Sequence, residues 1–301
     1  MQPSPTIKNI AAYRFARIDA PEALAERLRA WAEALDLRGS VLVAPEGLNL
    51  FLAATPERID AFLQRLYADA QYGELFAGMP VKVSVSQAVP FAKLKVKVKP
   101  EIIAFRREEA SPLQAERAPA VSPERLPAWI ERGQDERGRR LVLVDTRNRE
   151  ETAYGSFEQA WLPPIDNFTE LPAAIEAERE GWKGAAVVAF CTGGIRCEKA
   201  VLWMRANGVP DAMQLDGGIL GYFEHEGGAG YRGDCFVFDA RVALDPALRP
   251  IADAGAVDIG AADTAAADTG AADAGTVAAD AADNARHRAH REAMPGFDAP
   301  R

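Results

Sequence analysis

Residues 185–200 of this 301-residue chain read Ala-Ala-Val-Val-Ala-Phe-Cys-Thr-Gly-Gly-Ile-Arg-Cys-Glu-Lys-Ala. The six apolar residues at the start are typical of a central strand in a parallel sheet that is buried on both faces. Cys191 then falls at the carboxyl end of that strand, where α/β folds place their ligands. The two glycines let the backbone curl with its N–H groups inward, and a helix that begins near Cys197 adds the positive end of its dipole. Such a cradle stabilises a thiolate and any anion attached to it.

Two more residues of the same stretch are candidates for a role in chemistry. Arg196 is expected to add a permanent positive charge at the rim of the loop. For Cys197 two interpretations are open: a second, resolving thiol in the first turn of the helix, or a small residue packed under the loop. The alternative for Cys191 itself is a buried, inert cysteine beside an ordinary glycine turn. We favour a chemical role for Cys191, because a cysteine, two glycines, an arginine and a helix start occur together within seven residues.

The regions on both sides extend this stretch into a domain. Residues 141–144, Leu-Val-Leu-Val, are a second apolar run of the same kind. Helices are predicted over 171–180 and 198–207, and an earlier one over 122–132 has Pro123 in its first turn. The sequence therefore predicts an α/β domain over residues 122–246.

Residues 1–106 alternate strand and helix patterns in a different order. Strands are predicted near 9–18, with Tyr13, Phe15 and Ile18 as apolar members, and at 40–43, 49–53 and 81–85. Helices are predicted over 21–35 and from Pro56 onward. Strand, helix, strand, strand, helix, strand is the order of a ferredoxin-like (acylphosphatase-like) α+β domain. Residues 107–121, rich in Glu, Ala, Pro and Ser, are interpreted as a linker.

The end of the chain has the composition of a disordered segment. From residue 251 it consists mostly of Ala, Gly, Asp and Thr, and Asp recurs every five residues from Asp253 to Asp273. That period builds neither a helical nor a strand face, and few large apolar side chains are present to offset chain entropy. A low-complexity disordered tail is predicted over 247–301, with an acidic interaction arm as the alternative.

The spacing between Cys191 and Arg196 separates two kinds of cysteine chemistry. Cysteine phosphatases place five residues between the two, whereas four intervene here, which resembles the shorter loop of the rhodanese family. Three further segments are similar to rhodanese domains: Asp145-Thr146-Arg147, the continuation from Glu151 to Phe157, and residues 214–219, which contain Gly-Gly. Ser156 stands where many family members have His, and we expect this departure to be tolerated.

The rhodanese resemblance implies roles for these residues. Cys191 would be the persulfide-forming residue, with Arg196 and Cys197 beside it as catalytic candidates. The active-site loop would consist of Thr192, Gly193, Gly194 and Ile195. The remaining three charged residues would form an ion-pair network that supports this loop: Asp145, Arg147 and Glu151.

Motifs outside the loop narrow the resemblance. They lie at residues 44–49 (Ala-Pro-Glu-Gly-Leu-Asn), 95–103 (Lys-Val-Lys-Val-Lys-Pro-Glu-Ile-Ile) and 233–239 (Gly-Asp-Cys-Phe-Val-Phe-Asp). With a ferredoxin-like domain before a rhodanese domain, they make residues 7–246 similar to the rhodanese-type tRNA uridine hydroxylases. This implies an oxygen-dependent enzyme that places an oxygen on C5 of the wobble uridine (U34) of tRNA. Some members carry a cysteine-rich C-terminal extension, and the Asp/Ala-rich tail replaces it here.

One basic segment fits an RNA substrate. Lysines alternate with apolar residues from 93 to 99, and Arg106 and Arg107 follow. As a strand, this segment puts four ammonium groups on one face. The candidate phosphate contacts are Lys93, Lys95, Lys97, Lys99 and Arg106. The alternative is a solvated edge strand that its lysines protect against aggregation.

The overall charge neither requires nor excludes such a surface. The chain has 35 Lys and Arg against 44 Asp and Glu, a formal net charge of -9. Residues 251–301 hold 9 acidic and 4 basic residues and so contribute -5, which leaves -4 for residues 1–250. An acidic total argues against general nucleic-acid binding but says nothing about a local patch.

Several classes of protein are disfavoured. Three histidines and three cysteines lack the paired short spacings of a zinc site, and three scattered cysteines make no disulfide framework, so a reducing cytoplasm is expected. No run approaches the roughly 18 apolar residues of a membrane helix, and residues 1–10 have no secretory pattern. No metal cluster and no flavin or nicotinamide fingerprint is visible. Molecular oxygen, implied by the resemblance, is the expected co-substrate.

Three hypotheses follow. The first is a tRNA wobble-uridine hydroxylase that uses Cys191 as thiolate or persulfide, with the anticodon region of tRNA on a basic N-terminal surface and a possible sulfur or electron donor as second partner. The second is a sulfurtransferase that moves sulfur from thiosulfate or a persulfide donor to a thiol or carrier. The third is a non-catalytic RNA-binding module, which the presence of both Cys191 and Arg196 weakens. The lysines and the additional domain favour the first, and oligomeric state leaves no signal.

Overall fold

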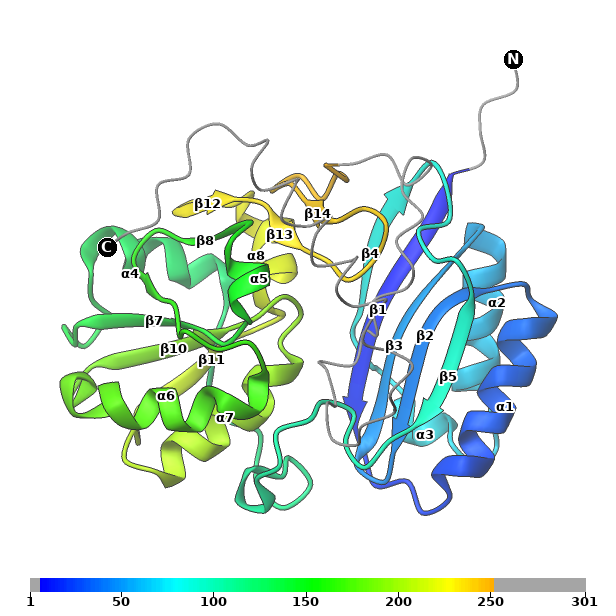
Figure 1. Ribbon diagram of the computed structural model, residues 1–301, viewed down its shortest axis with the longest axis horizontal. Coiled ribbons are helices and arrows are strands. Elements are labelled where there is room, and N and C mark those ends of the chain that lie inside the picture. The colour runs from blue at the N-terminus through cyan, green and yellow to red at the C-terminus, as the bar shows by residue number, and fades with distance from the viewer. Residues whose placement is uncertain (1–5, 252–301) are drawn as a thin grey trace, which may run out of the picture.

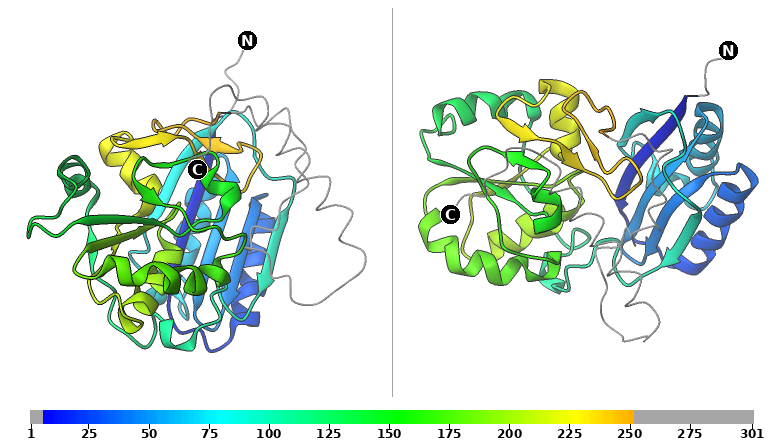
Figure 2. Two further views of the ribbon diagram at one scale, coloured as in Figure 1. Left: turned by 60° about the vertical axis from the view of Figure 1, so that its left-hand side comes forward. Right: turned by 45° about the horizontal axis from the view of Figure 1, so that its top comes forward.

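The computed structural model describes residues 6–251, which form two domains lying side by side (Figure 1). Figure 2 shows the same arrangement from two other directions, with the N-terminal domain in blue and the second domain in green and yellow. Most of the predicted tail, residues 252–301, lies outside the described residues.

The N-terminal domain is a five-stranded sheet with helices on one face only. Its strands, in the order β4-β1-β3-β2-β5, are β4 (Val81–Ser86), β1 (Ile7–Phe15), β3 (Gly47–Ala54), β2 (Arg38–Ala44) and β5 (Leu94–Val98). Helices α1 (Pro21–Ala34), α2 (Pro56–Tyr67) and the short α3 (Gly73–Phe76) cover the face turned away from the second domain (Figure 1). The predicted ferredoxin-like fold is confirmed, and β5 is an additional edge strand parallel to β2.

The pleat of β1 decides which side chains face the helices. Ile10 and Ala12 lie in the core against the helices. Side chains alternate along a strand, so Ala11, Tyr13 and Phe15 point to the opposite face. The sequence placed Tyr13 and Phe15 among the apolar members of a strand near 9–18, whereas β1 ends at Phe15 and its core side belongs to smaller residues. Two large aromatic side chains are thus left on the face of the sheet that the helices do not cover, where they meet the second domain.

The second domain is a parallel sheet covered on both faces. Its strands, in the order β6-β11-β10-β7-β9, are β6 (Ala120–Val121), β11 (Ala212–Leu215), β10 (Ala186–Phe190), β7 (Leu141–Asp145) and β9 (Ala160–Trp161). Helices α6 (Leu171–Glu178) and α7 (Ile195–Ala206) pack in one core, and α4 (Leu126–Arg132) and α8 (Gly218–Glu226) in the other. The predicted rhodanese fold is confirmed, and β7 and β10 are its buried central strands.

Short elements complete this domain. Helix α5 (Arg149–Thr152) follows β7, β8 (Gly155–Phe157) pairs with β12 (Tyr231–Gly233), and β13 (Cys235–Phe236) pairs with β14 (Ala243–Leu244). These elements bring the C-terminal segment of the domain beside β4 of the N-terminal sheet (Figure 1).

Three local predictions differ from the structure. The helix expected over 122–132 begins as a 3-10 turn, Pro123–Arg125, and becomes α-helical at Leu126, because Pro127 has no N–H to donate to the carbonyl of residue 123. Residues 120–121, assigned to the linker, form β6 against β11. Residues 247–251, assigned to the tail, include Ile251, whose N–H donates to the Ala243 carbonyl.

Candidate active site

Cys191 lies immediately after β10, inside a loop whose backbone closes around its sulfur. The thiol is 1% exposed, and the Gly194 N–H donates to Sγ at 3.1 Å. Gly194 has φ +99°, a left-handed conformation that turns its N–H inward. A Cβ on Gly218 would stand 2.5 Å from the Cys191 carbonyl oxygen, so glycine at this position is needed for α8 to pack against the loop. The predicted cradle is therefore formed by two glycine-rich segments.

The Arg196 side chain is largely buried beside this loop. It is 7% exposed, and its guanidinium forms two hydrogen bonds to the Glu151 carboxylate, at 2.6 and 2.7 Å. The permanent charge that the sequence predicts beside the loop is therefore largely buried and paired with Glu151 on α5. A paired guanidinium in this place still acts on Cys191 electrostatically, but both of its arms are engaged by protein.

The surroundings of Cys191 favour its thiolate. Burial alone would raise the pKa of the thiol. Hydrogen bonding from Cys197, the charge of Arg196 and the N–H groups of Gly194 and Arg196 together lower that pKa to about 6. Burial and the neighbouring Cys191 sulfur raise the pKa of Cys197 well above its ordinary value. These opposite shifts favour an arrangement in which Cys197, as a thiol, donates to a Cys191 thiolate.

Cys197 is completely buried, and its Sγ also lies 3.8 Å from Thr146 Oγ1. The structure packs Cys197 under the loop as a free thiol beside Cys191. Its contact with Cys191 gives that packed residue an electrostatic role as hydrogen-bond donor. The third cysteine, Cys235, is buried in β13, away from solvent.

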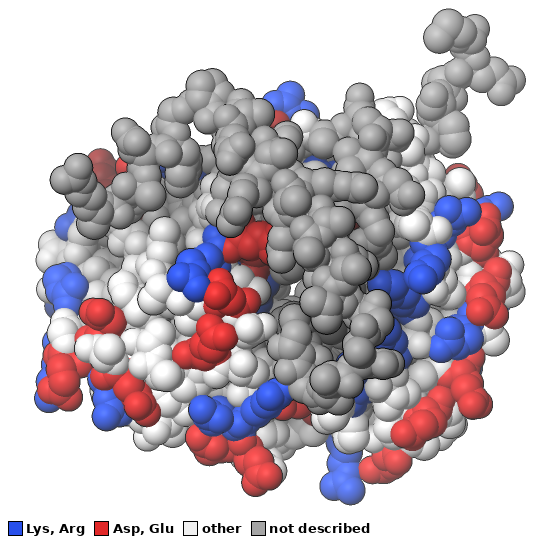
Figure 3. Space-filling model, in the orientation of Figure 1, with Lys and Arg blue, Asp and Glu red and all other residues white. Residues whose placement is uncertain are grey.

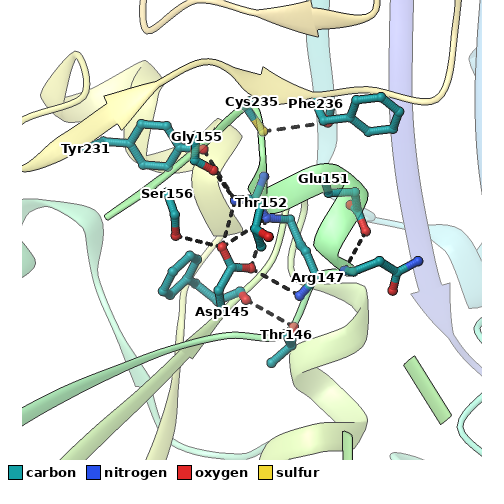
Figure 4. Close-up of polar contacts among 12 residues, drawn as sticks. Asp145, Thr146, Arg147, Glu151, Thr152, Gly155, Ser156, Tyr231, Cys235 and Phe236 are labelled. Carbon is teal, nitrogen blue, oxygen red and sulfur yellow. Dashed lines mark hydrogen bonds and ion pairs between the residues drawn. The ribbon is translucent and has the colours of Figure 1, made fainter. Parts of the chain in front are cut away.

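Beneath the loop, a second buried ion pair joins β7 to β8. The Arg147 guanidinium donates to Asp145 at 2.7 and 2.9 Å and to the Gly155 carbonyl at 2.6 Å (Figure 4). Ser156 donates its hydroxyl to Asp145 Oδ2 at 2.7 Å. Serine in place of the more usual histidine therefore still supplies a donor to this carboxylate. Asp145, Arg147 and Glu151 belong to two separate pairs that hold β7, β8 and α5 under the cysteine loop.

Charged residues also connect the loop to the N-terminal domain. Lys199 on α7 is 3% exposed, and its Nζ contacts Glu46 Oε1 at 2.8 Å and Glu101 Oε2 at 2.5 Å. Glu46 lies in the β2–β3 turn and Glu101 follows β5, so one lysine holds two segments of the other domain. We call these three residues the Lys199 cluster. The sequence contained all three within its distinctive motifs, but nothing in their spacing indicated that they meet.

Three more contacts join the domains around the loop. Tyr13 Oη lies 3.4 Å from Glu198 Oε1, Lys82 Nζ lies 2.6 Å from Glu224 Oε2, and Arg241 Nη1 donates to Ser84 Oγ at 2.6 Å. Burial, followed by the charge of Glu198 and the neighbouring Cys191 and Cys197 side chains, raises the pKa of Tyr13 well above its ordinary value. Tyr13 therefore lies, as a neutral phenol, within the electrostatic field of the two cysteines.

A cavity of about 620 Å³ lies between the domains. The uncovered face of the N-terminal sheet lines one side, including Tyr13, Phe15 and Phe51. The cysteine loop lines the other side through Cys191, Thr192, Gly193, Ile195 and Arg196. Cys191 therefore lines a chamber that has the size of a small-molecule or nucleotide site.

The predicted basic residues do not line this cavity. Lys95 and Lys97 are on β5, on the same sheet face as Tyr13 but three strands away, which is about 14 Å. Lysine and arginine side chains gather over β5 in Figure 3. Lys93 and Lys99 flank the strand, and Arg106 follows it with a positive φ of +57°. The structure brings Cys191, Arg196, Cys197 and Glu151 together and leaves the basic residues at the far edge of the sheet.

Within residues 6–251, no group of three His, Cys, Asp or Glu side chains is arranged to hold a metal ion. In the same part of the chain, no helix is long and apolar enough to cross a membrane.

The fold and the cysteine loop define a two-domain protein of the rhodanese type. A model of the UPF0176 acylphosphatase-like domain matches residues 7–102, and a rhodanese-like domain model matches residues 122–225. A yeast protein tyrosine phosphatase of the rhodanese family is a similar solved structure, with 15% identity, a TM-score of 0.33, and coverage of 40% of this chain and 94% of that one.

Curated relatives are much more similar. A protein of Xanthomonas euvesicatoria pv. vesicatoria (strain 85-10), named tRNA uridine(34) hydroxylase, is 59% identical over 248 residues, which is 82% of this chain and 98% of the relative. A protein of Xylella fastidiosa (strain M23) with the same name is 56% identical over 251 residues, 83% of this chain and 96% of the relative. The chain belongs to the tRNA uridine(34) hydroxylase family.

Proposed function

We propose that this protein hydroxylates C5 of uridine 34 in tRNA, with the target base in the interdomain cavity and Cys191 as the reacting group, in thiolate or persulfide form. The observation that carries this proposal is a thiolate-favouring cysteine that faces a cavity of about 620 Å³ built from both domains. A sulfurtransferase acting on thiosulfate requires only the cysteine loop, whereas a nucleotide requires a chamber of this size. The three free cysteines fit a reducing cytoplasm, where tRNA is modified.

The reaction also defines what else the enzyme requires. Replacing the C5–H of uracil by C5–OH with molecular oxygen puts one oxygen atom on the base and releases the other as water. This consumes two electrons and two protons beyond those of the substrate. The proposal therefore includes molecular oxygen as co-substrate and a two-electron donor of the thiol class.

The first expected result concerns the modification itself. In a bacterial host without its own uridine-34 hydroxylation pathways, expression of this protein is expected to introduce 5-hydroxyuridine at position 34 of tRNA, because relatives that match 82% of the chain carry that name. Mass spectrometry of tRNA nucleosides measures it. Nucleosides no different from those of the empty-vector host, with thiosulfate sulfurtransferase activity present in the purified protein, would favour the second hypothesis.

We further propose that Lys93, Lys95, Lys97, Lys99 and Arg106 contact tRNA phosphates. Lys95 and Lys97 are on the edge strand β5, the other three flank or follow it, and β5 belongs to the sheet that also lines the cavity, so an RNA backbone held at this edge lies beside the chamber that contains Cys191. Phosphate contacts position a nucleic acid without reading its sequence.

The double change Lys95→Glu and Lys97→Glu is expected to weaken tRNA binding about tenfold or more and to reduce the salt dependence of binding by about two counterions. Binding titrations between low and physiological salt measure both effects. Lys183→Glu is the matched control, because this exposed lysine lies at the opposite, amino end of β10. An unchanged salt slope in the double variant would remove these lysines from the tRNA interface.

A further inference from the structure

We infer that the part of the N-terminal sheet that lines the cavity is a base-stacking platform, formed by Tyr13, Phe15 and Phe51, on which unpaired anticodon-loop bases lie while the target uridine faces Cys191. This inference rests on the proposed function and assigns the recognition of the RNA single strand to particular side chains. These aromatic side chains would contact the bases, whereas the lysines of β5 would contact the phosphates.

The register places the three aromatic residues together. In the β1–β3 pair, Ala11 is opposite Phe51 and Tyr13 is opposite Asn49. Residues directly opposite each other share a face, so Tyr13, Phe15 and Phe51 all project from the side that no helix covers. All three line the cavity that contains Cys191. Strands β1 and β3 are the second and third of the five strands, so the aromatic residues stand well inside the sheet.

The chemistry of this face fits unstacked bases. Sequence-specific RNA recognition targets single-stranded loops, whose bases stack on aromatic side chains of an open sheet. The ferredoxin-like sheet with aromatic residues on two neighbouring strands is the arrangement that RNA recognition motifs use for this purpose. Here the same register continues to the basic edge: Asn49 pairs with Leu42, and Leu42 pairs with Lys97. Tyr13 and Lys97 are therefore at the two ends of one row across the sheet, whose middle members Asn49 and Leu42 are buried, Asn49 through a hydrogen bond to the Ile102 carbonyl.

Tyr13 also connects the platform to the reacting cysteine. A Cβ on Gly194 would lie 3.0 Å from Tyr13 Oη, and this hydroxyl lies 3.4 Å from Glu198 Oε1. The Tyr13 hydroxyl therefore lies against the loop that holds Cys191. The Lys199 cluster fixes the two domains on either side, and Lys199 Nζ itself lies 5.8 Å from the Phe15 ring centroid. A base stacked on Tyr13 is consequently held at a defined position relative to Cys191.

The test removes rings while keeping apolar volume. Tyr13→Leu and Phe51→Leu are compared with Tyr13→Phe and Phe51→Tyr, which keep the rings. The probe is an anticodon stem-loop RNA with 2-aminopurine next to position 34, whose fluorescence is quenched when the base stacks. Each leucine variant is expected to bind this RNA about 5- to 150-fold more weakly and to lose quenching, whereas the aromatic variants retain both.

The measurements distinguish base stacking from two other roles, namely phosphate binding and hydrogen bonding through the Tyr13 hydroxyl. The salt slope of binding should stay unchanged in the leucine variants, because no phosphate contact is lost. Wild-type affinity and quenching in both leucine variants would overturn the inference even if the wild-type enzyme hydroxylates uridine 34. Equal losses in Tyr13→Phe and Tyr13→Leu would assign the role to the hydroxyl and overturn stacking at that residue. Failure of the proposed function is seen separately, as absence of 5-hydroxyuridine with wild-type protein.

Discussion

Cys191→Ser is expected to reduce hydroxylation of uridine 34 by about 10³-fold or more with little change in fold. Serine has the size of cysteine and can accept the Gly194 hydrogen bond, but its hydroxyl does not ionise near neutral pH and cannot carry a persulfide. The measurement is single-turnover conversion of anticodon stem-loop RNA, together with the melting temperature of the variant. Cys235→Ser is the matched control, because Cys235 is equally buried in β13, outside the cavity lining. Full activity in Cys191→Ser would remove this residue from the chemistry.

The same cysteine should show its low pKa directly. A thiolate alkylates and a thiol does not, so the rate of Cys191 alkylation is expected to rise with pH through a midpoint of about 6 and to level off above it. Cys197→Ala removes the hydrogen-bond donor that lowers this pKa, and the midpoint should therefore move to higher pH. Mass spectrometry of the labelled peptide assigns the reaction to Cys191. A midpoint near that of an ordinary cysteine in the wild-type protein would contradict stabilisation of the thiolate by the loop.

The cysteine loop was predictable because its chemistry is local. A strand, two glycines, an arginine and a helix start are adjacent in sequence, and their backbone geometry follows from those residues alone. The direction of Arg196 was not predictable in this way. Its partner Glu151 is 45 positions away, and only the packing of α5 under the loop shows that the guanidinium is bound inward.

Tyr13 shows a second limit of the sequence. In a single strand an aromatic residue is equally suited to the core and to an uncovered sheet face. Tyr13 faces away from the helices because Ile10 and Ala12 occupy the core side of β1. These two residues alone did not form a hydrophobic pattern strong enough to indicate the core side from the sequence. The Lys199 cluster was hidden for a related reason, since its three members come from two domains and are joined only when the sheet face and α7 are brought together. Sequence patterns thus described each domain well and the cavity between them poorly.

Lys199→Met is expected to destabilise the protein by about 3–5 kcal/mol, because it leaves two carboxylates in a buried site without their cation. The side chain of Lys199 is 3% exposed, and those of Glu46 and Glu101 are 14% and 24% exposed, so water screens the cluster only weakly. Chemical denaturation measures the change. Because the cluster joins the domains, the variant is also expected to unfold in two separate transitions where the wild type unfolds in one.

The pH dependence of this loss identifies its cause. Burial already raises the pKa of Glu46, and the charge of Lys199 opposes that rise. Without the lysine this pKa rises further, so the carboxyl takes up a proton at higher pH and the buried charge disappears. The destabilisation should therefore be largest at neutral and alkaline pH and should shrink as the pH falls toward about 5. Adding Glu46→Gln and Glu101→Gln to Lys199→Met is expected to restore much of the stability at neutral pH, since neutral amides leave no unpaired charge. A loss of equal size at every pH, unaffected by the two amides, would indicate that Lys199 acts through packing of its aliphatic stem and that the domains are held together by other contacts.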